Sequence, residues 1–193
     1  QELQGIQTQD LERGKAFILG LLAPNVDARI FEIVSYSILK YYYHDQTVYI
    51  GFEIEKLVKE NLKLYKTGRT NANDGGIDFV MRPLGRFFQV TETLDIRKYL
   101  LDIDKIEKYP ITFVIKSTDS IDSLKTKLEE RARRQFAIKL IVDRYMASIE
   151  EIVNIPALIE RFESAVEQGY LGSILGEIVR QSKIEYNYEI DEA

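Results

Sequence analysis

The residue best placed to do chemistry is Asp78, which closes the run Asp-Gly-Gly-Ile-Asp at positions 74–78. Gly75 and Gly76 remove side-chain bulk just before it, so the backbone there can approach a phosphate closely. The apolar run that follows Asp78 predicts a strand over 77–81, with the carboxylate at its beginning. A carboxylate at a strand end is a natural ligand for a hard cation such as Mg²⁺.

A second strand, predicted over 87–91, carries Gln89, Val90 and Thr91. Pro83-Leu84-Gly85 is a tight turn, so the two strands form a hairpin. Side chains two apart on a strand share a face, which places Gln89 and Thr91 where they can meet Asp78. Val90 points into the core and offers its carbonyl oxygen. Mg²⁺ bound by such oxygens polarises a phosphate and activates water, which is the chemistry of phosphodiester hydrolysis.

These residues resemble the signature of the PD-(D/E)xK nucleases. The run 74–78 with the following strand and Gln89 is similar to the Mrr-like branch, in which glutamine often replaces the second carboxylate. The run Phe-Gln-Val-Thr-Glu at 88–92 resembles a stretch of type IIS nickases and their relatives. The resemblance covers about 28–116. It implies an α/β fold, with a restriction-endonuclease-like core of a short mixed sheet flanked by helices, and a Mg²⁺-dependent DNA endonuclease activity.

The family's Phe-Glu helix adds an acidic residue to the metal site, and the run 28–32, which ends in Glu32, resembles it. A second Phe-Glu pair ends in Glu53 and is the alternative. Glu32 is favoured because its helix has the better N-cap and the longer apolar stripe. The resemblance and the hairpin together predict four metal ligands: Glu32, Asp78, Gln89 and Val90.

Two positions depart from the family pattern. Gln89 stands where a second acid is expected, and Thr91 stands where the motif lysine is expected. Glu92 is an additional acid, although alternation turns it away from Gln89. The catalytic set is therefore Glu32, or Glu53 in its place, with Asp78, Gln89, Thr91 and Glu92. The missing positive charge must come from elsewhere, and three substrate-binding candidates remain open: Lys66, Arg69 and Lys98.

The surrounding pattern predicts one nuclease domain over 1–193, with a core at about 25–118 and helical additions at about 1–24 and 119–183. Helices are predicted at 10–22, from a cap at Asn25 or Asp27 to about Tyr43, at 52–62 and at 95–107. The run 47–50 predicts a strand or a packed turn, and 111–116 predicts a strand. Leu64 and Tyr65 lead into a polar, glycine-rich loop predicted over 66–76. The remainder, 119–183, is predicted to be helical, with Asp119 or Ser120 as its first cap and breaks at Pro156 and Gly169.

Composition limits the function classes. The chain has no cysteine, a single histidine, a net charge of −5 and a pI of about 5.1. Thiolate metal sites, disulfides and histidine-based nuclease sites are excluded. No apolar run reaches the length of about 18 residues that a membrane span needs, and no signal-peptide pattern is present, so we expect no membrane partner and a cytoplasmic, prokaryotic location.

An acidic chain lacks the basic surplus that a free-standing DNA binder usually shows. The chain also resembles the small subunits of heterodimeric type IIS restriction endonucleases, in which a larger subunit reads the site and nicks one strand. Double-stranded DNA and such a subunit are the expected partners. The alternatives are a self-sufficient homodimeric restriction nuclease and a catalytically inactive nuclease-fold binding or scaffold module. One basic stretch, 125–134, is either a phosphate contact or a solvated helix face.

Overall fold

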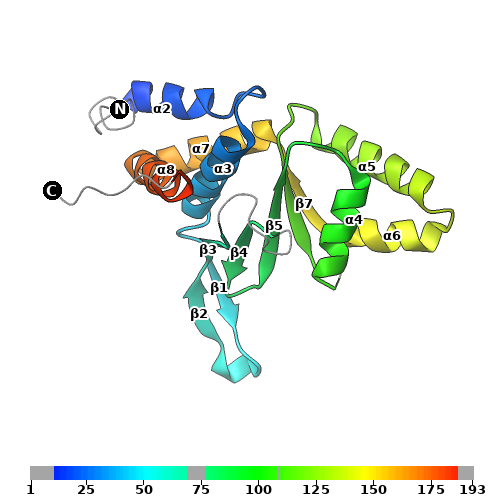
Figure 1. The fold of residues 1–193 in the computed structure, drawn as a ribbon. Helices are drawn as coiled ribbons and strands as arrows, with labels where there is room; N and C mark the ends of the chain where they lie inside the picture. Colours follow the sequence, from blue (N-terminus) through cyan, green and yellow to red (C-terminus); the bar gives the residue numbers. More distant parts are fainter. Residues whose placement is uncertain (1–10, 69–76, 108, 187–193) are drawn as a thin grey trace.

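The computed structural model describes residues 11–68, 77–107 and 109–186 of the chain (Figure 1). They form a mixed α/β structure around a five-stranded sheet in the order β3-β4-β5-β6-β7. The strands are β3 (Lys63–Lys66), β4 (Phe79–Arg82), β5 (Arg86–Thr91), β6 (Ile111–Ile115) and β7 (Ile149–Val153). The β3, β4 and β5 strands are antiparallel neighbours, whereas β5, β6 and β7 run parallel. The short mixed sheet is therefore confirmed.

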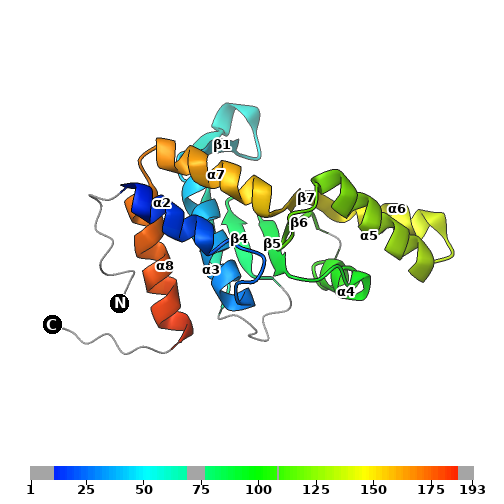
Figure 2. The same ribbon diagram turned by 90° about the horizontal axis from the view of Figure 1, so that it is seen from above.

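Helices cover both faces of this sheet (Figure 2). One face packs against α3 (Ala28–Tyr42), α7 (Ile155–Glu167) and α8 (Leu171–Glu185), with α2 (Leu11–Gly20) against α8. The other face packs against α4 (Ile96–Lys105), α5 (Ile121–Gln135) and α6 (Lys139–Ser148). Two apolar clusters fill these layers, and β5 contributes to both because its residues alternate. Phe88 and Val90 face α3, while Phe87 faces the α4 side.

Side-chain caps set where several helices begin. Asp27 accepts a hydrogen bond from the Arg29 N–H, so of the two predicted caps for α3 it is Asp27 that acts. Asp95 caps α4 and Ser120 caps α5 in the same way. Asn154 caps α7 by accepting from the Ala157 N–H. The break predicted at Gly169 is also confirmed, because Gly169 adopts a φ of 90° between α7 and α8.

The helix predicted over 52–62 is wrong. This segment contains a single 3-10 turn, η1 (Ile54–Lys56), followed by β2 (Val58–Asn61), which pairs with β1 (Thr47–Ile50). The resulting hairpin projects away from the sheet (Figure 1). It closes where the Leu62 N–H donates to the Gln46 carbonyl at 2.8 Å. Cross-strand pairing determines this structure, because most apolar side chains of the segment are exposed and find no core to pack against: Phe52, Ile54, Leu57 and Val58.

Two further strands depart from the prediction. The Lys63–Lys66 segment was expected to lead into a loop, yet it forms β3 at the edge of the sheet. The Ile149–Val153 segment was expected to be helical, yet it forms β7. The predicted strands at 47–50, 77–81, 87–91 and 111–116 and the helix at 95–107 are present with small boundary shifts. Asp10, the expected start of the first helix, lies outside the described residues. Within the described ranges, no helix combines the length and apolarity that crossing a bilayer requires.

Candidate functional site

Three strands bring predicted site residues to one end of the sheet, and a fourth strand, β6, ends there as well. The β3 strand ends at Lys66, β4 begins directly after Asp78, β5 ends at Thr91 and β6 ends at Ile115. Because β4 runs antiparallel to both neighbours and β5 runs parallel to β6, these termini lie at the same end. We call it the site end. The first turns of α3 and α4 also lie close to it, through contacts described below.

Asp78 is held by both neighbouring strands. Its carbonyl accepts from the Thr67 N–H at 2.9 Å, and its own N–H donates to the Phe88 carbonyl at 2.9 Å. The Val90 N–H donates to Asp78 Oδ2 at 2.6 Å. The register of β4 with β5 reaches only to Phe88, so the carboxylate supplies the partner that the strand ladder would otherwise give to Val90. This charge-assisted hydrogen bond fixes the carboxylate in the plane of the sheet.

Gln89 and Thr91 are buried on the face of the sheet that packs against α4. Gln89 Nε2 donates to the Val90 carbonyl at 3.2 Å. Gln89 Oε1 is buried and has no hydrogen-bond partner among the described residues. The Thr91 hydroxyl is occupied by Thr93, donating to its carbonyl at 3.1 Å and accepting from its N–H at 3.3 Å. A buried oxygen without a partner costs free energy, so the Gln89 carbonyl is a candidate ligand position.

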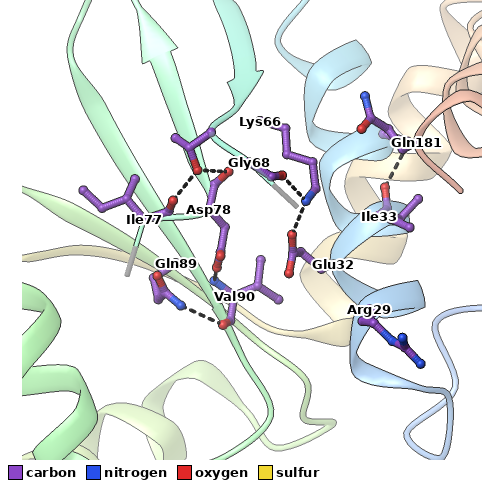
Figure 3. Close-up of polar contacts among 12 residues, drawn as sticks. Arg29, Glu32, Ile33, Lys66, Gly68, Ile77, Asp78, Gln89, Val90 and Gln181 are labelled. Atoms are coloured by element: carbon purple, nitrogen blue, oxygen red, sulfur yellow. Dashed lines mark hydrogen bonds and ion pairs between the residues drawn. The ribbon is translucent and has the colours of Figure 1, made fainter. Parts of the chain in front are cut away.

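Glu32 lies on the opposite face, on α3. Its Oε1 and Lys66 Nζ are 2.5 Å apart, and both side chains are buried, at 7 % and 8 % exposure. Lys66 Nζ also donates to the Gly68 carbonyl at 2.7 Å. Figure 3 shows Lys66 between Gly68 and Glu32, with Asp78 beside Val90 and Gln89 on the side of Val90 away from Glu32. Lys66, expected in a loop, is thus the last residue of β3 and an ion-pair partner of the predicted helix carboxylate.

A second buried cation, Lys116, was missed by the sequence analysis. It follows β6 directly, and its N–H donates to the Thr91 carbonyl at 2.9 Å. Its ammonium, 5 % exposed, pairs with Glu92 and donates to the Val26 carbonyl. Lys116 Nζ lies 6.0 Å from the centre of the Phe31 ring, so it faces α3. Alternation from the buried Val114 would have indicated this face, but only the fold brings Lys116 beside Glu92.

The remaining candidates are Glu53, Lys98 and Arg69. Glu53 precedes η1 in the projecting hairpin, is exposed and pairs with Lys56 at 2.7 Å. It does not join Asp78, and Glu32 is the Phe-Glu carboxylate at the site end. Lys98 is exposed in the first turn of α4, shortly after β5 ends. Arg69 lies outside the described residues, as do Asp74, Gly75 and Gly76.

The described residues offer oxygen ligands but not a ready-made cluster of carboxylates. No group of three or more His, Asp or Glu side chains that could hold an ion occurs within 11–68, 77–107 and 109–186. Three oxygens of different kinds lie around the point where β4 and β5 separate: the Asp78 carboxylate, the Val90 carbonyl and the buried Gln89 Oε1. This mixed set suits a hard cation that keeps several waters, and it does not suit a soft metal.

Comparisons with models of protein families, with curated proteins and with solved structures found no match to this chain.

Proposed function

We propose that this chain is a Mg²⁺-dependent DNA endonuclease that hydrolyses phosphodiester bonds, centred on Asp78. The observation that carries the proposal is the geometry at the separation of β4 and β5. There the Val90 N–H fixes the Asp78 carboxylate, and the buried Gln89 Oε1 lies next to the Val90 carbonyl without a partner among the described residues. An oriented carboxylate beside an unsatisfied amide oxygen is what a hard cation requires.

Each residue then has a definite task. When bound, Mg²⁺ polarises the scissile phosphate and lowers the pKa of an attacking water. Asp78 supplies the negative charge, and Gln89 supplies an uncharged oxygen. Lys66 supplies a positive charge near the end of β3, in place of the lysine that the family motif has where Thr91 stands. Glu32, on the opposite face of the sheet from Gln89, holds Lys66 in place through their buried ion pair.

The proposal includes a partner. The chain carries a net charge of −5, so unaided binding to DNA is opposed electrostatically. We therefore propose that it is the cleavage subunit of a type IIS restriction enzyme, placed on DNA by a larger subunit that recognises the site and nicks the other strand. The self-sufficient homodimeric nuclease is the other arrangement of the same catalytic function. The chain alone should then cut DNA far more slowly than it does after mixing with that subunit.

One observation favours a second candidate, a catalytically inactive nuclease-fold module. Glu32 pairs with Lys66 and Asp78 accepts from Val90, so each carboxylate has an internal partner. Thr91, in place of the motif lysine, is occupied by Thr93. In that case the site end would serve only to hold the sheet together.

Asp78→Asn separates these functions. The asparagine oxygen still accepts from the Val90 N–H, so the fold is retained while the charge is lost. The matched control is Asp45→Asn, which removes one charge from an exposed carboxylate bonded to the Tyr170 hydroxyl at 2.6 Å. Two measurements are needed: Mg²⁺ binding by calorimetry, and nicking of supercoiled plasmid with and without the larger subunit.

We expect Asp78→Asn to weaken Mg²⁺ binding at least about tenfold, as the loss of a charged ligand should, and to abolish nicking. Asp45→Asn should match the wild type in both. Nicking at the wild-type rate by Asp78→Asn would refute the assignment. A wild-type chain that neither binds Mg²⁺ nor nicks with its partner would establish the inactive module instead.

A further inference from the structure

The α5 helix presents a line of positive charge on one flank. Its buried stripe is Leu124, Leu128 and Ala132, which recur every four residues and face the core. At 100° per residue, three basic residues fall together on one side of that stripe: Lys127, Arg131 and Arg134. Lys125 and Arg133 fall on the other side. We call the first set the α5 ridge.

The ridge begins at the site end. Lys127 Nζ lies 2.7 Å from Oδ2 of Asp119, in the segment that follows β6. The Arg131 guanidinium donates to the carbonyl of Leu94, in the segment that follows β5. Both segments leave strands whose ends form the site end. Figures 1 and 2 show α5 extending from this part of the sheet toward the periphery of the molecule, so the ridge leads outward from the strand ends that carry the candidate site.

Charge is unevenly distributed along the chain. Residues 121–148, which contain α5 and α6, hold seven basic and four acidic side chains, a surplus of three, although the whole chain has a net charge of −5. Arg134 is exposed and has no ion pair or side-chain hydrogen bond within the described ranges. Lys127 is 44 % exposed, and such surface pairs are easily exchanged for another anion. This local surplus of positive charge therefore favours binding of an anionic ligand here.

We propose that the α5 ridge binds consecutive phosphates of the DNA strand that leads away from the site end. This inference rests on the proposed nuclease function and identifies how an acidic chain holds its substrate. Lys127 and Arg134 are separated by about 10 Å along the helix axis, from a rise of about 1.5 Å per residue. That length corresponds to about three base-pair steps of about 3.4 Å along the axis of a duplex. The exposed large apolar residues of this region are not on the ridge: Ile121 begins α5, and Ile138 and Leu140 lie at the start of α6.

The same helix supplies a matched control. Lys127→Gln with Arg134→Gln removes two charges and one surface ion pair, the one with Asp119. Lys125→Gln with Arg133→Gln removes two charges and one surface ion pair as well, the one with Glu129. Both double variants leave the buried stripe unchanged. Fluorescence anisotropy measures binding of a fluorescein-labelled duplex of about 30 base pairs, which is about three helical turns. EDTA is present, so that no cutting occurs.

We expect the ridge variant to lose at least about fivefold in affinity near 50 mM salt, and its salt-dependence slope to fall by about 1–2, because two phosphate contacts are lost. The control should stay within about twofold. Equal losses of affinity in both variants, or no DNA binding by the wild type, would contradict the proposal that the α5 ridge binds DNA. A ridge variant that binds DNA as the wild type does, but no longer binds phosphatidylserine vesicles, would also contradict it. Because EDTA removes the metal from the assay, failure of the Asp78 assignment would leave the DNA-binding result readable.

Discussion

The buried ion pair between Glu32 and Lys66 makes the sharpest prediction about stability. Its atoms lie 2.5 Å apart, and the two side chains are only 7 % and 8 % exposed. Glu32→Gln keeps the shape of the side chain and removes its charge. Lys66 is then left as a buried ammonium held by the Gly68 carbonyl. Lys66→Met makes the reciprocal change.

The magnitude follows from what is left behind. Removing one partner of a buried ion pair typically costs about 3–5 kcal/mol. The retained bond to Gly68 and the remaining exposure place Glu32→Gln at the low end, about 3 kcal/mol. In a chain of this size that lowers Tm by about 6–12 °C. The double variant Glu32→Gln with Lys66→Met leaves no unpaired charge. It should cost no more than either single variant, which corresponds to a coupling free energy of about 2–3 kcal/mol.

Urea unfolding of the wild type, both single variants and the double variant completes the cycle. Glu53→Gln is the control, because its partner Lys56 is 71 % exposed, and such a pair contributes less than about 1 kcal/mol. If each single variant costs less than about 1 kcal/mol, or if the double variant costs their sum, Glu32 and Lys66 are not coupled. The description of this pair as buried would then be wrong.

Two further stability predictions concern other polar contacts. Asn154→Ala removes the α7 cap and leaves the Asp119 carbonyl without its 2.7 Å donor, so it should lower the free energy of unfolding by about 2–3 kcal/mol. Ser120→Ala removes an exposed cap with one hydrogen bond and should lower it by about 1 kcal/mol. Urea unfolding measures both. Burial raises the pKa of Glu177, but hydrogen bonds from Arg180 and other neighbours outweigh it and hold that pKa below the usual 4.5. The Glu177 carboxylate therefore contributes its full stabilisation of the fold above pH 4.5, and this contribution is lost as the pH falls through the lowered pKa of Glu177. Glu177→Gln should flatten this acid limb of the unfolding free energy, and an unchanged limb would contradict the assignment.

The hairpin around Asp78 could be predicted because its signals are local. The glycines before Asp78, the turn at Gly85 and the alternation around Val90 all lie within 20 residues. Helix caps such as Asp27 and Asp95 are local as well. Each of these features is determined by a residue and its near neighbours in the chain, so the pattern alone was sufficient.

The β7 strand could not be predicted, because its pattern is irregular. A register shift between Ile111 and Thr112 places Ile111 opposite Ile149 and Thr112 opposite Glu151, so the expected alternation breaks. The strand also carries two adjacent acids, Glu150 and Glu151. In the fold both pair with Arg86, at 2.9 and 2.6 Å, which the sequence separates from them by more than 60 positions.

The candidate site shows the same division. Asp78 and Gln89 were identified from their own hairpin. The partnerships of Glu32 with Lys66 and of Glu92 with Lys116 depend on α3 and β6 packing beside that hairpin. Glu32 and Gln89 were also expected to belong to one ligand set, whereas in the structure their side chains lie on opposite faces of the sheet. Only the three-dimensional arrangement reveals that separation.

The projecting hairpin of β1 and β2 has a consequence for how this chain can be modified. The 2.8 Å hydrogen bond from Leu62 to Gln46 means that the chain departs from and returns to the same point. Among the strands of the described residues, β1 and β2 pair with each other and with no strand of the five-stranded sheet. Residues 47–61 can therefore be exchanged for a short turn, or extended by an inserted peptide or reporter domain, while α3 and β3 keep their positions. A binding segment can thus be inserted in the hairpin, by natural variation or by design, without changing the end of the sheet that carries Asp78.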